Sequence, residues 1–396
     1  MKKLALLSAA VAVCASQVTF AALEPQGIDL EPFLLVPTVA VAYTQNSNIY
    51  GLSHDAVSSS VIFITPTLDL IAQDRDNLYR ARYGLIAQVY GESDNNAFDH
   101  LFSVSAHIEP TGRFRFDLGA GYNLLHDNAG TGRTEGIVTA AGKHDPDTFS
   151  LATLNAAVDY GAKDAAGQIG LSLGQSQKRY DLAAAADSRD LDIQNAALEF
   201  RLRVMPKTRL LLDIEQDQGN YSNAVTAAKL DYTESRYLVG VSWEGSANTT
   251  GKVRVGNGKR SPSVGPDVSS LVWGVGVVWT PRARDSVTID GSQAFKDGTF
   301  PTTSIDSRSL ALGWSHSWAD RWQSSLTAAL GKDDHNVVAG FPARQDDSTT
   351  LGLALNYQMR RWFMLGAGAT LLQHNSNLAN FEYDRQIISL NAQLSL

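Results

Sequence analysis

Segments in which apolar and polar residues alternate follow one another along most of this chain, and tight polar turns separate many of them. In 114–123, residues such as Phe114, Leu118 and Tyr122 occupy every second position, between charged, small or amide neighbours. Successive side chains of a strand point to opposite faces, so this spacing predicts strands with one apolar face. Tight turns are expected at 73–77, 110–113, 161–164, 205–208, 246–249, 281–284, 319–321 and 359–361. Because longer connections alternate with these turns, the pattern is typical of an up-and-down barrel in an outer membrane.

The turns divide the chain into paired strands. We expect strands near 33–44, 58–73, 78–91, 97–109, 114–126, 148–160, 167–180, 190–204, 209–221, 231–245, 250–260, 271–280, 285–296, 305–318, 322–332, 347–358, 362–374 and 383–396. The predicted fold class is all-β, a transmembrane antiparallel up-and-down β-barrel of about 18 strands, with 16 as the alternative. Short periplasmic turns and longer extracellular loops would connect them. An even strand number places both termini in the periplasm, and barrels of about 16–18 strands leave an aqueous channel.

Charged residues occur in the middle of several predicted strands. A soluble β-sandwich would also alternate, but its inner face is dry, and unpaired charges there are costly. The residues expected to line a wet lumen are Arg80, Arg82, Asp117, Glu199, Arg201, Arg203, Asp213, Glu215, Glu234, Arg236, Lys252, Arg254 and Asp290. Two interpretations stay open: mixed-sign rings that hydrate a passing polar polymer, or charges that pair simply to stabilise a water-filled interior.

Tryptophans stand beside the predicted tight turns. Rings at one end of successive strands are typical of an aromatic girdle at a membrane interface, although ordinary core tryptophans are the alternative. The predicted girdle residues are Trp243, Trp279, Trp318, Trp322 and Trp362. Near the opposite strand ends, Tyr90, Tyr180 and Tyr221 are candidates for stacking against sugars.

The first residues have the character of a secretory signal peptide. Lys2 and Lys3 precede an apolar run, and small residues around Ala21 predict cleavage after that position. We therefore expect a signal peptide at 1–21, a periplasmic segment at 22–32 and the barrel at 33–396. The only cysteine, Cys14, lies in the leader, and the bulky Val13 before it disfavours a lipid anchor. The mature chain would contain no cysteine and no disulfide.

Composition and motifs argue against several other functions. The formal net charge is −8, and losing two lysines with the acid-free leader would make it −10, which disfavours nucleic-acid binding. The run 170–174 matches a G-x-S-x-G nucleophile elbow, but it falls within one predicted strand and lacks the required strand-to-helix turn. The histidines show no metal-ligand spacing, and the acidic run 332–336 is expected in a charged outer loop. We predict no enzyme activity, no metal and no cofactor.

Short motifs resemble those of the putative β-barrel porin type 2 family. The matching segments are 361–368, 375–377 and 381–385 near the C-terminus, 205–212 at a mid-barrel turn, and 43–50 in the opening strand and loop. Gln45 and Ser47 depart from the pattern, because an acidic residue is more usual in that loop. The resemblance covers nearly the whole mature chain, and its motifs specify a barrel better than they specify a transported molecule.

The resemblance implies a transporter in the outer membrane of a Gram-negative cell. Family members are commonly encoded with exopolysaccharide or biofilm-matrix systems, where they look like the exit channel. The expected partners are outer-membrane lipid, the polysaccharide, a periplasmic polysaccharide export protein and the barrel assembly machinery. A general or sugar-uptake porin is the first alternative, and a structural or adhesive surface barrel is the second.

Overall fold

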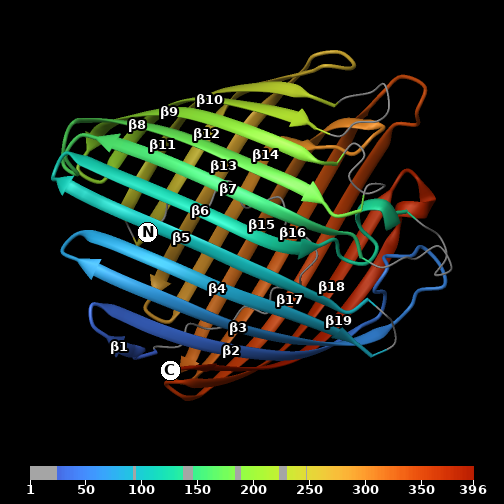
Figure 1. Ribbon diagram of the computed structural model, residues 1–396, viewed down its shortest axis with the longest axis horizontal. Helices are drawn as coiled ribbons and strands as arrows, with labels where there is room; N and C mark the ends of the chain where they lie inside the picture. Colours follow the sequence, from blue (N-terminus) through green and yellow to red (C-terminus); the bar gives the residue numbers. More distant parts are fainter. Residues whose placement is uncertain (1–24, 92–94, 137–145, 183–188, 223–229, 247) are drawn as a thin grey trace.

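The computed structural model describes residues 25–91, 95–136, 146–182, 189–222, 230–246 and 248–396. The predicted signal peptide, 1–21, lies outside these residues. Strands β2 to β19 form one closed antiparallel sheet in which each strand pairs with its neighbours in sequence, and β19 returns to β2 (Figure 1). The fold is therefore an all-β, eighteen-stranded up-and-down barrel, as predicted.

A short strand, β1, precedes the barrel and pairs with the beginning of β2. The strands are β1 (Ile28–Leu30), β2 (Phe33–Asn46), β3 (Ser59–Asp74), β4 (Asn77–Tyr90), β5 (Ala97–Thr111), β6 (Phe114–His126), β7 (Thr148–Tyr160), β8 (Gly167–Tyr180), β9 (Leu191–Met205), β10 (Thr208–Tyr221), β11 (Tyr232–Ser246), β12 (Thr249–Pro262), β13 (Val268–Arg282), β14 (Asp285–Asp297), β15 (Thr302–Ala319), β16 (Trp322–Val337), β17 (Arg344–Arg360), β18 (Phe363–Ser376) and β19 (Tyr383–Ser395). Two 3-10 helices, η1 (Gly132–Thr134) and η3 (Ala379–Phe381), lie in outer connections. No helix among the described residues is both long and apolar enough to cross a membrane.

Every predicted tight turn joins two observed strands at the same end of the barrel, where the C-terminus also lies (Figure 1). One prediction about the other end is wrong. The acidic run 332–336 is not a loop, because β16 continues to Val337. Asp333 is paired with Ser307 of β15 on one side and with Asp346 of β17 on the other, so backbone pairing carries these strands beyond the apolar zone.

The wall has its apolar side chains outside and its polar side chains inside. In β10, the outward Leu212 and Ile214 are 53% and 51% exposed, whereas the inward Leu211 and Asp213 are 2% and 4% exposed. A protein surrounded by water would reverse this distribution. Leucines on an outward surface fit lipid contact, and the inner face forms a polar lumen.

Candidate transport lumen

Ion pairs cover the inner wall formed by β9 to β12. Arg254 of β12 reaches across β11 to β10, where its Nη1 lies 3.0 Å from Asp213 Oδ2 and 3.2 Å from Glu215 Oε1. Lys252, two residues away, spans a longer path to Glu199 of β9, with Nζ and Oε2 2.7 Å apart. The side chains therefore lie along the wall and neutralise charges on strands that are not adjacent.

Arg201 of β9 extends this network toward β7. It forms ion pairs with Glu199 on its own strand and with Asp159 on β7. Arg201 is 7% exposed, so both pairs form in a shielded part of the wall. Charge-assisted hydrogen bonds of this kind are strong and keep a buried guanidinium compensated.

Glu234 of β11 is the most deeply buried carboxylate of the network, at 1% exposed. Its Oε2 accepts hydrogen bonds from Arg260 Nη2 at 2.7 Å and Nε at 2.8 Å, and its Oε1 accepts one from Arg236. Arg236 is also paired with Glu215 of β10, at 2.7 Å. The guanidinium of Arg260 lies 3.8 Å from the ring centre of Tyr232, which adds a cation–π contact.

The structure thus brings together most of the charged residues predicted for the lumen. Those joined by ion pairs within β9 to β12 are Glu199, Arg201, Asp213, Glu215, Glu234, Arg236, Lys252 and Arg254. Arg80 and Arg82 lie apart on β4 and share the carboxylate of Asp69 on β3. Asp117 of β6 pairs with His107 at 2.6 Å. Arg203 and Asp290 form no ion pair with any side chain in the described part of the chain.

Several partners were missed by the sequence reasoning. Asp69, Asp159, Asp217 and Arg260 complete ion pairs but were not among the predicted lumen residues. Asp69 and Asp159 alternate in the same phase as other inward residues of their strands, so this phase could have identified them as lumen residues. Their partners depend on strand register, which the phase alone does not specify.

The wall formed by β15 to β19 has a different chemistry. Its inward positions at mid-barrel carry mainly hydroxyls, amides, glycines and alanines rather than charges. A Cβ at Gly368 of β18 would come within 2.9 Å of Ser389 Oγ on β19, and Gly352 is similarly close to Thr327 Oγ1. These glycines leave room for neighbouring hydroxyls on the lumen face. The lumen therefore combines a charged wall whose groups are mostly paired with a neutral wall that can hydrogen bond.

At the outer mouth, residues 127–136 form part of the connection after β6 and cross toward the far wall. Arg344 Nη2 at the start of β17 lies 2.5 Å from Glu135 Oε1, and Asn380 donates a 3.1 Å hydrogen bond to the Gly136 carbonyl. Along the wall, β6 and β17 are separated by β18, β19 and β2 to β5. Figure 1 shows η1 beside η3 at this end. The connection therefore covers part of the opening.

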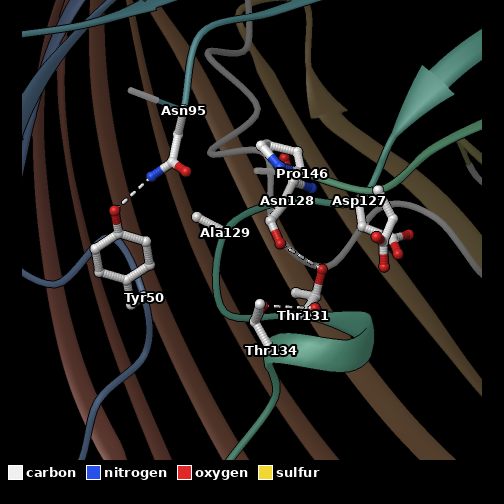
Figure 2. A pocket seen from close by; sticks show the side chains of 9 residues that line it. Tyr50, Asn95, Asp127, Asn128, Ala129, Thr131, Thr134 and Pro146 are labelled. Carbon is white, nitrogen blue, oxygen red and sulfur yellow. Dashed lines mark hydrogen bonds between the residues drawn. The ribbon is translucent and has the colours of Figure 1, made fainter. Parts of the chain in front are cut away.

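A small cavity lies beneath this connection, between Tyr50, Asn95 and Thr131. Asn95 Nδ2 donates a 2.6 Å hydrogen bond to the Tyr50 hydroxyl across it (Figure 2). Its volume of about 10 Å³ matches the space of a single water molecule. The cavity belongs to the packing of the connection and is too small to hold a sugar.

The tyrosines considered for sugar stacking do not present free faces. Tyr221 is 3% exposed and its hydroxyl donates to the Gly298 carbonyl at 3.2 Å. Tyr180 is 7% exposed, packs against Phe149 and bonds Arg189 at its hydroxyl. The hypothesis is therefore wrong for these two residues, because their rings are used in packing the outer wall. Tyr90 is half-buried against Ile49 and Tyr50.

The predicted girdle tryptophans lie at the tight-turn end of the wall. Trp279, Trp318, Trp322 and Trp362 are 40% to 61% exposed. Trp243 instead packs over Gly251, with its Nε1 donating to Thr249 Oγ1 at 3.0 Å.

The serine of 170–174, Ser172, lies inside strand β8. That placement lacks the turn that a nucleophile elbow requires.

Comparisons with known proteins found one matching family and several similar solved structures. A family model described as "Putative beta-barrel porin 2" matches residues 21–396. Among solved structures, OccK3 of Pseudomonas aeruginosa is similar, with 11% identity and a TM-score of 0.47 over 92% of this chain and 96% of that one. The FrpB iron transporter of Neisseria meningitidis has 9% identity and a TM-score of 0.47 over 91% and 81% of the two chains. A loop L8 deletion mutant of OmpT, an outer membrane protein of Vibrio cholerae, has 10% identity and a TM-score of 0.39 over 92% and 100%. No curated protein sequence matches.

Proposed function

This chain belongs to the Putative beta-barrel porin 2 family, and on that premise we propose that it is an outer-membrane channel that secretes an exopolysaccharide. It receives the polymer from a periplasmic polysaccharide export protein and releases it outside a Gram-negative cell. The barrel supplies the membrane-crossing part of the route and performs no covalent chemistry.

The single observation that carries this proposal is the pairing of the lumen charges. Arg254 and Lys252 are each within 3.0 Å of a carboxylate oxygen, and Glu234 is compensated by two arginines. A long polymer needs a path without one tight site, because conduction requires that each contact be weak enough to leave. Compensated charges together with hydroxyl and glycine positions on β15 to β19 provide such a path for a hydrated sugar chain.

Two matched substitutions on β17 test the conduit. Thr350 lies in the inward phase, whereas the adjacent Leu351 points outward and is 50% exposed. In a strain lacking the gene, the wild-type barrel and Leu351→Trp should restore secreted polysaccharide, and Thr350→Trp should restore much less because a bulky ring narrows the lumen. Both variants should be present as folded barrels in isolated outer membranes.

Normal polysaccharide secretion by the deletion strain would refute the proposal. A barrel that instead gives steady open conductance in planar bilayers and supports growth on external sugars would be an uptake porin. Loss of surface attachment after shortening an outer connection, with secretion and conductance unchanged, would indicate an adhesive barrel.

A further inference from the structure

Near the periplasmic end, the inner wall holds two arginines directly opposite each other. Arg203 of β9 and Arg209 of β10 are partners in the strand register. Facing side chains on neighbouring antiparallel strands have Cβ atoms about 4.5–5.5 Å apart, and like charges there are destabilising. The arrangement therefore needs a compensating negative charge.

The carboxylates of this region do not supply that charge. Asp159 and Glu199 are both engaged by Arg201, and Glu199 also binds Lys252. In the adjacent tight-turn region, Asp164 and Glu244 are exposed, and neither forms an ion pair with Arg203 or Arg209. Glu244 attracts the Arg209 guanidinium from a distance, but neither arginine is ion-paired with a carboxylate among the described residues.

Arg209 also has an unsatisfied donor. Its Nη2 donates a 2.5 Å hydrogen bond to the Lys163 carbonyl in the turn between β7 and β8. Its Nη1 is buried and has no hydrogen-bond acceptor among the described residues. A buried charged donor without an acceptor is costly, so such a group is usually completed by a water, an ion or a ligand.

We propose that Arg203 and Arg209 form an anion-binding entry site for the carboxylate, sulfate or phosphate groups of an acidic glycan. The identity of the ligand rests on the proposed export function. The planar fork of a guanidinium group matches two oxygens of any of these anions and binds them through paired hydrogen bonds. An anionic group between the arginines relieves their repulsion and satisfies Arg209 Nη1.

Equilibrium binding tests the site without requiring transport. The purified barrel in detergent is titrated calorimetrically at low salt with oligogalacturonate and with a neutral malto-oligosaccharide of the same length. The wild type should bind only the acidic probe. Arg203→Gln and Arg209→Gln should each weaken binding by about tenfold, the effect of losing one charge-assisted contact. Arg321→Gln, which removes an exposed charge at another turn, should change it by less than about twofold.

A second readout separates binding from folding. Arg209→Gln should keep or raise the unfolding temperature, because it removes a like-charge contact. The proposal is wrong if both variants bind as tightly as the wild type, if the neutral probe binds equally well, or if affinity and unfolding temperature fall together. Binding of inorganic phosphate without binding of oligogalacturonate would overturn the glycan assignment. Arginine-dependent binding in a barrel whose deletion leaves secretion unchanged would refute only the export function.

Discussion

Replacing Glu234 by glutamine should destabilise the barrel strongly, because this carboxylate joins three strands. Glu234 of β11 is almost fully buried and binds Arg260 of β12 through two hydrogen bonds of 2.7 and 2.8 Å. It also pairs with Arg236, which is held by Glu215 of β10. Glutamine keeps the size of the side chain but removes its charge, so no large cavity forms.

The expected loss of stability depends on which ion pairs each arginine keeps after the substitution. Removing one partner of a buried ion pair typically costs about 3–5 kcal/mol, since the other charge remains buried. Arg260 keeps Asp297 at 3.1 Å, and Arg236 keeps both Glu215 and Asp217. We therefore expect a loss near the lower limit, about 3 kcal/mol in the free energy of unfolding.

Urea unfolding of the barrel in lipid vesicles, followed by tryptophan fluorescence, measures this loss. Asp347→Asn is the matched control, because Asp347 is 64% exposed and lies 3.7 Å from Lys332. An exposed pair of this kind contributes at most about 1 kcal/mol. If Glu234→Gln costs less than about 1 kcal/mol or no more than the control, the reasoning that this network holds the wall is refuted.

Three further outcomes are expected. A Glu135→Cys/Arg344→Cys pair, joined by a cleavable bis-maleimide that spans the two long side chains it replaces, should lower polymer secretion until the crosslinker is cleaved; equal secretion in both states would show that the connection need not move. Trp318→Ala should lower stability in vesicles by about 1.5–3 kcal/mol, the scale of burying one large apolar side chain, and an unchanged urea midpoint would argue against lipid anchoring. Gly352→Val should cost about 1–3 kcal/mol, because the added atoms meet the Thr327 hydroxyl, whereas Gly112→Ala has open space around it and should cost less; equal losses in urea unfolding would contradict this packing.

Much of the fold could be predicted because each strand carries its own signal. The segment predicted at 114–126 is the observed β6, Phe114–His126, and the turn at 205–208 joins β9 to β10. Both depend on local alternation and turn chemistry, which neighbouring residues determine. The outer end of β16 was missed because the adjacent Asp333 and Asp334 make both faces polar there. Alternation of polar and apolar residues cannot identify a strand where it extends beyond the lipid-facing zone, because both of its faces are then polar.

The chemistry of the lumen was less predictable. The sequence identified Arg254 and Asp213 as inward residues, but their contact crosses a strand and depends on the stagger between β10 and β12. The opposition of Arg203 and Arg209 also depends on register, with a shift between Thr208 and Arg209. Neither property is encoded by the residues of one strand. The sugar-stacking role was predicted for Tyr221 only from its position near the outer end of a strand. The neighbouring residues that bury its ring come from other parts of the chain.

The seam between β19 and β2 constrains how a cell can make this protein. Thr38 and Ser395 share a 2.7 Å hydrogen bond although 357 positions separate them in the chain, and Gly27 donates to the carbonyl of Leu396 at 3.0 Å. The ring cannot be sealed before the ribosome has delivered the last strand, so truncated products would keep an open edge. Because β2 and β19 are already neighbours, a circularly permuted gene that links them and places the new termini in another short turn should encode the same barrel.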